Sequence, residues 1–303
     1  MSQTIGGGIT VKDEVLIGPV RAPVNPAARL NASIHNDEVA QKLGFRGGTI
    51  AGSIHMDQFP PLLVQAFGQK WFETGSLSLY FVNATLHRET VRAFLKQPEG
   101  NSDVQTQVWM DRDPEGDAAT AGMKVAEGTA SVGNPADQSE LHRRDLRLSD
   151  PEELRIFRDV RAGDSLGDQK DSLSSNDQAM RIEKGQITEP LDWYTGRTPW
   201  GGPIAPPSAA ISLLYRKPSR SFSRHAEGSV GLFGAIELRM VNGPVMLDTT
   251  YNLGGEIVGV GQSPKTEYVW YDSYANDETG KRVAGMRMLL RFMKASAKQY
   301  EDA

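Results

Sequence analysis

The sequence contains no cysteine, which excludes disulfide bonds and thiolate metal sites. It also lacks an apolar run approaching the roughly 18 residues that a membrane-spanning helix requires. Its first residues do not have the charged-then-apolar layout of a signal peptide. These absences favour a soluble, cytoplasmic protein without a membrane partner.

Basic charge is not concentrated anywhere, and the net charge is −5. A nucleic-acid partner is therefore not expected. The five histidines and the carboxylates do not fall at metal-ligand spacing, and the glycines at 6–8 do not continue as a dinucleotide-binding fingerprint. We expect neither a metal ion nor a nucleotide cofactor.

What the sequence does contain is an internal repeat. Residues 47–51 read GGTIA and residues 201–205 read GGPIA. Three further matches follow in the same order, and the spacing between the copies grows only slowly: 79–83 with 238–242, 108–111 with 269–272, and 121–124 with 284–287. Ordered self-similarity of this kind predicts one structural unit used twice. A length of 303 residues suits two domains as well.

Each copy is expected to hold one long helix and a meandering antiparallel sheet, an α+β unit. Apolar residues recur at helical spacing over 50–67, where Ser53 could begin the helix and Gly68 end it. The prolines at 60–61 predict either a kink or a helix that starts there. Eight runs with alternating apolar and polar residues predict strands at 76–86, 90–96, 103–111, 121–132, 234–242, 249–261, 265–273 and 282–293.

The segment between the copies is polar. We assign residues 1–133 to the first unit, 134–178 to a linker and 179–303 to the second unit. Within the linker, Ser149 and the apolar set Leu154, Phe157 and Val160 predict one short helix over 149–160. The charges of the linker are interpreted as a solvated face.

One stretch resembles a known family. Residues 34–45 read IHNDEVAQKLGF and are followed by GTIA at 48–51. This is similar to the motif of MaoC-like hydratases and dehydratases, in which an Asp, Asn-Pro, an aliphatic residue and a His precede a short acidic-led helix that ends in Gly-Phe. The resemblance implies a double hot-dog fold of two tandem units. It also implies a hydro-lyase in which the Asp and the His, here His35, act together on a 2-enoyl thioester.

The match departs from the motif at several positions. The family's Asp, Asn and Pro fall on Leu30, Ala32 and Ser33. The usual His-Gly of the following turn is replaced by Gly52-Ser53. Half of the expected Asp–His pair is therefore missing, which leaves the fold prediction intact and weakens the carried-over mechanism.

Hydration of a conjugated double bond needs a base, an acid and donors for the enolate oxygen. His35 is the leading base, because histidine exchanges protons readily near neutral pH; the alternative is a loop histidine bound to backbone. His55, at the start of the main helix, is a second catalytic candidate or an ordinary hydrogen-bonded histidine. Asn31 and Asp192 are candidates to assist His35, with Asp192 reaching across from the other copy.

Five residues are candidates for substrate binding. Gly52 and Ser53 could present backbone N–H groups to an oxyanion, or simply form a tight turn. Asp57 lies two residues from His55 and hence on another helix face; its alternative role is a first-turn charge. Tyr194 and Trp200 occupy the place in the second copy that corresponds to His35, and a core position is the alternative for the tryptophan.

The sequence thus predicts a hydratase or dehydratase acting on an enoyl or 3-hydroxyacyl small molecule, with CoA thioesters among the candidates. His35 has no histidine counterpart in the second copy, which favours one site. Two alternatives stay open: other hot-dog chemistry, namely a thioesterase or an isomerase, and a non-catalytic protein that binds an acyl or other small molecule. A homodimer is a further expectation.

Overall fold

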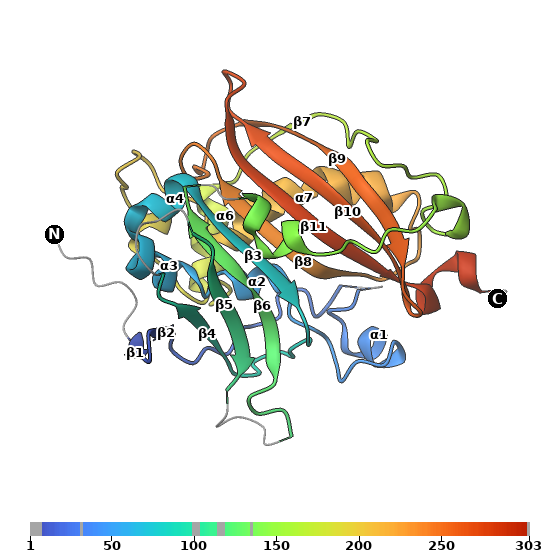
Figure 1. Ribbon diagram of the computed structural model, residues 1–303, viewed down its shortest axis with the longest axis horizontal. Coiled ribbons are helices and arrows are strands. Elements are labelled where there is room, and N and C mark those ends of the chain that lie inside the picture. Colours follow the sequence, from blue (N-terminus) through green and yellow to red (C-terminus); the bar gives the residue numbers. More distant parts are fainter. Residues whose placement is uncertain (1–7, 31–32, 99–103, 114–118, 134–135, 302–303) are drawn as a thin grey trace.

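The computed structural model describes residues 8–30, 33–98, 104–113, 119–133 and 136–301, apart from the side chains of 216–220 and 223. Within this part of the chain the strands form one antiparallel sheet in the order β1-β2-β4-β5-β6-β3-β8-β11-β10-β9-β7. Figure 1 shows this sheet as one layer, with α7 crossing behind the strands.

All eight predicted strands are present, four in each half. Their bounds are β3 (Gly75–Phe81), β4 (Val91–Lys96), β5 (Thr106–Arg112), β6 (Lys124–Val132), β8 (Gly231–Met240), β9 (Tyr251–Gln262), β10 (Thr266–Asn276) and β11 (Arg282–Met293). The order β4-β5-β6-β3 in the first half mirrors β8-β11-β10-β9 in the second. The two halves join where β3 pairs with β8, with Leu77 opposite Leu238.

Equivalent contacts confirm one match of the predicted repeat and correct another. The Asn83 side chain donates a hydrogen bond to the Lys124 carbonyl at 2.8 Å. Its counterpart Asn242 donates to the Arg282 carbonyl, also at 2.8 Å. The repeated asparagine therefore makes the same contact after β3 and after β8, to the first residue of β6 and of β11. Lys124 thus corresponds to Arg282, so the predicted match of 121–124 with 284–287 is wrong by five residues.

The remaining elements are short, with one exception. They are β1 (Thr10–Lys12), β2 (Val15–Ile17), β7 (Gln169–Asp171), α1 (Asp37–Lys42), α4 (Trp71–Thr74), α5 (Glu140–Arg143) and α6 (Ser175–Glu183), with three-residue 3-10 turns between them. The exception is α7 (Pro207–Ser223), the long helix predicted for the second half. Among the described residues, no helix combines the length and apolar character that crossing a membrane requires.

Of the alternatives for 50–67, the helix that starts at Pro60 is confirmed, and one continuous helix from Ser53 is wrong. The structure has two helices there, α2 (Gly52–Met56) and α3 (Pro60–Phe67), separated by residues 57–59. Pro60 has no N–H to continue the hydrogen bonds of α2, so it begins a new helix instead. The core lies between these helices and the sheet face toward which Leu77, Ile236 and Leu238 point; we call the opposite face the outer face.

The helix predicted over 149–160 is also absent. Residues 151–153 form only a 3-10 turn, capped by Asp150 rather than by Ser149. The buried Glu267 carboxylate accepts hydrogen bonds from the N–H groups of Arg155 (2.7 Å), Ile156 (3.0 Å) and Phe157 (3.0 Å). These donors would otherwise bond within a helix, so a carboxylate from β10 holds the segment in an extended turn.

We predict that Glu267→Gln lowers the free energy of unfolding by about 1–3 kcal/mol, because charge-assisted hydrogen bonds to three backbone donors are weakened in a buried place. Chemical denaturation would measure the change. Glu278→Gln, at an exposed position, is the matched control. An equal effect of the two substitutions would contradict this role of Glu267.

Candidate functional site

A cavity of about 600 Å³ lies between the two halves. The first half lines it with the His35 loop, α2 and the end of β3. The second half supplies the end of α7, the turn at 226–229, the start of β8 and the end of β11. Neither half alone can form the whole wall. We call this space the inner cavity.

His35 lines the inner cavity with its ring in a defined tautomer. The Nδ1 atom lies 2.6 Å from the carbonyl oxygen of Thr49. A carbonyl oxygen can only accept, so Nδ1 carries the hydrogen. In the neutral ring the lone pair then lies on Nε2, which has no hydrogen-bond partner among the described residues, the arrangement that a general base requires.

The loop that carries His35 is held by backbone contacts on both sides. The Asn25 amide donates to the His35 carbonyl at 2.8 Å. The Asp37 carboxylate accepts from the Gly48 N–H at 2.7 Å. A Cβ at Gly48 would overlap the His35 carbonyl oxygen, so glycine is required there. The sequence GGTI thus places the Thr49 carbonyl within hydrogen-bonding distance of His35 Nδ1.

His55 lies in α2 and also lines the inner cavity. Its side chain is only 2% exposed. Its Nε2 atom lies 2.6 Å from the Thr85 hydroxyl, and its Nδ1 atom is buried without a partner among the described residues. Burial lowers the pKa of His55 to about 4, so the ring is neutral near pH 7.

The second copy replaces this polar pair with apolar residues. Ile50 donates its N–H to the Thr85 carbonyl at 2.8 Å, and Ala205 donates to the Val245 carbonyl at the same distance. Ile50 therefore corresponds to Ala205 and Thr85 to Val245, and by the same alignment His55 corresponds to Ala210. A hydroxyl and an imidazole occur together in the first copy only, which is what a single functional site would require. Sequence reasoning missed Thr85, although the aligned repeats contain this signal.

Close packing against Phe81 explains why glycine stands at position 52, where the family motif has histidine. A Cβ at Gly52 would overlap the ring of Phe81, so no larger residue fits while Phe81 keeps its place. Gly52 lines the inner cavity, whereas Ser53 is half-buried and is not part of the described wall. Ala51 provides no side-chain cap, and the N–H groups of Gly52 and Ser53 have no partner among the described residues.

Asp57 binds another part of the protein, not the inner cavity where a substrate contact was expected for it. It is fully buried, outside the described cavity wall, and accepts hydrogen bonds from the N–H (2.7 Å) and hydroxyl (2.6 Å) of Ser208. Burial raises the pKa of Asp57 to about 6, although these bonds oppose the shift. The carboxylate of the first half therefore caps the first turn of α7 in the second half.

Asp192, Tyr194 and Trp200 do not join His35. Asp192 is exposed, and none of the three belongs to the described wall of the inner cavity. Tyr194 is buried, and burial together with the charges of Asp57 and Glu189 raises the pKa of its phenol well above the ordinary value. The Trp200 ring packs against Phe72 and Trp193.

The position of the family's aspartate offers no substitute either. Leu30 is 58% exposed and does not line the described part of the cavity. Asn31, the other expected helper of His35, lies outside the described residues. Among the described residues, no group of three or more His, Cys, Asp or Glu side chains is arranged to hold a metal ion.

The rest of the cavity wall combines apolar and aromatic side chains with the polar residues Ser33, Asn83 and Ser229. Glu227, at the exposed turn after α7, is the one carboxylate residue of the described wall, which contains no lysine or arginine. Such a wall suits an uncharged group and does not offer a cation to a carboxylate or phosphate. The aromatic residues come from both halves: Phe45, Phe81, Tyr215, Phe222, Phe233 and Phe292.

His55 and Asp57 predict opposite dependences of stability on pH. Between pH 4 and 6.5 the unfolded state binds the proton of His55 and the folded state does not, so this group makes stability rise with pH. Between pH 3.8 and 6 the folded state keeps the proton of Asp57 and the unfolded state releases it, so this group makes stability fall as pH rises. Each contribution amounts to about 3 kcal/mol across its window.

Single substitutions should separate the two contributions. We expect the unfolding free energy of Asp57→Asn, relative to wild type, to increase from pH 4 to 6.5, and that of His55→Gln to decrease. Denaturant titrations at several pH values would measure both, with Asp192→Asn at an exposed position as the control. Differences that stay constant with pH would contradict the two burial effects.

Comparison with known proteins agrees with this architecture. No family model and no curated protein matches the sequence significantly. Among solved structures, a protein from Chloroflexus aurantiacus described as a MaoC-domain dehydratase is 13% identical, with 97% of this chain and 99% of that chain covered and a TM-score of 0.57. A Mycobacterium tuberculosis protein described as having a double hotdog fold is 12% identical, with 94% and 97% covered and a TM-score of 0.56.

A third structure, described as a MaoC-like dehydratase, is 14% identical, with 91% of this chain and 97% of that chain covered and a TM-score of 0.51. At such low identities the likeness concerns the fold, and it extends over nearly the whole of each chain. The resemblance to MaoC-like proteins is thereby confirmed at the level of architecture: this chain has the hot-dog fold of those proteins.

Proposed function

We propose that the protein is a hydro-lyase that adds water to, or removes it from, an enoyl or 3-hydroxyacyl compound bound in the inner cavity. The observation that carries this proposal is the tautomer of His35, whose Nδ1 is committed to the Thr49 carbonyl and whose Nε2 is free to accept a proton. Its position in the wall of a cavity that both halves line adds support.

In the hydration direction, His35 Nε2 takes a proton from water as the water oxygen bonds to the β-carbon. The electron pair of the double bond moves toward the carbonyl and forms an enolate. The imidazolium then returns the proton to the α-carbon, so one O–H bond breaks and one C–O and one C–H bond form. Because one group performs both transfers, this route does not need the aspartate that Leu30 replaces.

The enolate oxygen needs hydrogen-bond donors that the fold already holds in place. The N–H group of Gly52, open at the first turn of α2, is one candidate. His55 is the other: if the Thr85 hydroxyl donates to Nε2, the hydrogen lies on Nδ1, which is buried here and would reach a ligand only after its neighbours shift. A low pKa keeps this ring neutral, so it would act as a donor rather than as the base.

The decisive experiment is turnover by purified protein offered enoyl and 3-hydroxyacyl CoA thioesters, followed by mass spectrometry for a gain or loss of water. We expect His35→Ala to lower kcat/KM by about 10²–10⁴-fold, the usual contribution of a general acid–base. His225→Ala, outside the described cavity wall, is the matched control. Circular dichroism would verify that both variants fold.

The other outcomes identify the alternatives. Release of a free acid would support a thioesterase, and rearrangement at constant mass would support an isomerase. Binding of a thioester without any turnover would favour a non-catalytic binding protein. Water exchange that persists in His35→Ala would remove His35 from the mechanism. A homodimer stays a prediction, which sedimentation of the same sample would test.

The charge of the cavity wall predicts a preference between substrates. A neutral thioester should be turned over with a kcat/KM at least about tenfold above that of the free acid of the same chain, a difference of about 1.4 kcal/mol, because no described cation of the wall offsets a carboxylate. Glu227→Gln should narrow the gap by removing a like charge. Equal kcat/KM values for the thioester and the free acid would contradict the inference that the wall disfavours a carboxylate.

A further inference from the structure

A second cavity, of about 600 Å³, lies on the outer face of the sheet in the second half. It shares no lining residue with the inner cavity, so it is a separate space. Its wall includes His142 of α5 and residues of β8, β9, β10 and β11. We call it the outer cavity.

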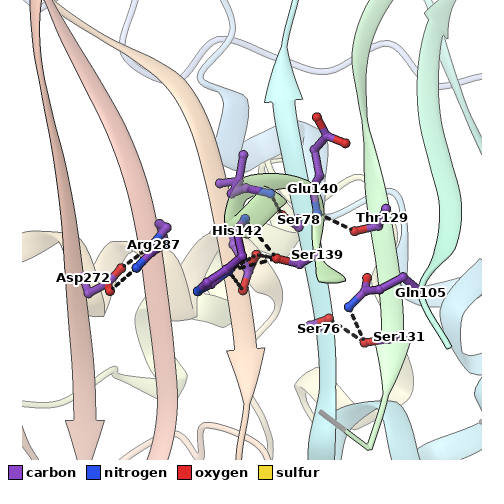
Figure 2. Close-up of polar contacts among 12 residues, drawn as sticks. Ser76, Ser78, Gln105, Thr129, Ser131, Ser139, Glu140, His142, Asp272 and Arg287 are labelled. Carbon is purple, nitrogen blue, oxygen red and sulfur yellow. Dashed lines mark hydrogen bonds and ion pairs between the residues drawn. The ribbon is translucent and has the colours of Figure 1, made fainter. Parts of the chain in front are cut away.

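The outer cavity is bounded on one side by the linker. The N–H groups of Glu140 and Leu141 donate to the hydroxyls of Thr129 (2.9 Å) and Ser78 (3.1 Å), which fix α5 on the outer face. Figure 2 shows these contacts and, beside them, Ser139 and His142 above the strands. The wall of the outer cavity is therefore formed by strands of the sheet and by α5, which hydrogen bonds hold in place.

Two rows of residues cross the floor from strand to strand. In the first row Glu237 lies opposite Arg287, which lies opposite Asp272. In the second row Arg239 lies opposite Gly285, which lies opposite Tyr274. A Cβ at Gly285 would meet nothing nearer than the Ser273 carbonyl oxygen at 3.7 Å, so the absence of a side chain leaves a hollow between Arg239 and Tyr274.

The carboxylates of the first row are already engaged. Glu237 is fully buried, accepts a hydrogen bond from the Ser139 hydroxyl at 2.5 Å and lies 3.3 Å from His142 Nδ1. Asp272 binds Arg287 through two hydrogen bonds of 2.8 and 2.7 Å, drawn in Figure 2. Glu256 continues this first row and is exposed at the rim.

Arg239, in the second row, is different. Its guanidinium is half-buried and has no hydrogen-bond or ion-pair partner among the described residues. Burial lowers its pKa, while the nearby charges of Glu237 and Asp272 only partly offset that effect. Arginine stays charged in proteins, so a cation whose donors have no partner among the described residues faces the hollow. Arg282, the other cation beside this row, binds Asn276 at 2.7 Å and stacks on Tyr274.

We propose that the outer cavity is a second binding site, for a small organic anion whose carboxylate or phosphate group binds Arg239 above Gly285. Both groups present paired oxygens that match the fork of a guanidinium. The remaining volume of the outer cavity accommodates the body of the ligand. This site does not depend on the hydro-lyase proposed for the inner cavity.

Isothermal titration of the full-length protein with malonate and, separately, with inorganic phosphate, at constant ionic strength in sodium chloride, tests the proposal. We expect at least one of them to bind, and the tighter one identifies the group that the site prefers. Arg239→Gln and Gly285→Val, which fills the hollow, should each weaken that binding at least about tenfold, as the loss of one charge-assisted contact implies. Arg143→Gln, at a side chain 58% exposed, is the control and should leave binding unchanged.

The folded state of each variant is checked by circular dichroism. The absence of binding tighter than about 10 mM by either anion would overturn the proposal. Unchanged affinity in Arg239→Gln or in Gly285→Val would overturn it as well, because the anion would then bind elsewhere. Loss of affinity in Arg143→Gln to the same degree would attribute the binding to general surface charge.

Discussion

The antiparallel ladder between β3 and β8 is the constraint on which the rest of the structure depends. It runs from Ser76 opposite Arg239 to Tyr80 opposite Ala235 and makes one sheet out of two repeats. With this pairing the helices of both halves lie on one face, so the end of α7 and the start of β8 face the loop of His35. The same ladder places Glu237 beside Ser78, where α5 docks on the outer face.

The two copies have the same order of strands but differ in the polar side chains at the start of their helices. At the start of α7 the Asp57 carboxylate binds Ser208, so the position where an anion would lie is filled from within the protein. At the start of α2 the corresponding donors of Gly52 and Ser53 stay open. Together with the replacement of His55 and Thr85 by Ala210 and Val245, this difference concentrates the reactive side chains in the first copy.

Much of the fold could be predicted from the sequence, because strand alternation, the repeat and the break at Pro60 are local signals. His35 was found through a local motif. The linker turn was not, because its hydrogen-bond acceptor, Glu267, lies more than a hundred residues away. Asp192 was misplaced because sequence correspondence to the His35 segment does not bring the two segments together: Asp192 is exposed and lies outside the described wall of the inner cavity.

The bond between Asp57 and Ser208 has a consequence for how such a protein can diversify. In a symmetric dimer of identical single units, any substitution appears twice, and a buried acid introduced at one helix start appears at the other as well. Covalent duplication removes that obligation. One copy can lose its histidine and have its helix start capped by a carboxylate, while the other keeps its histidine and an uncapped helix start. The hydrogen bonds between Asp57 and Ser208 then make the fold of each copy depend on the other.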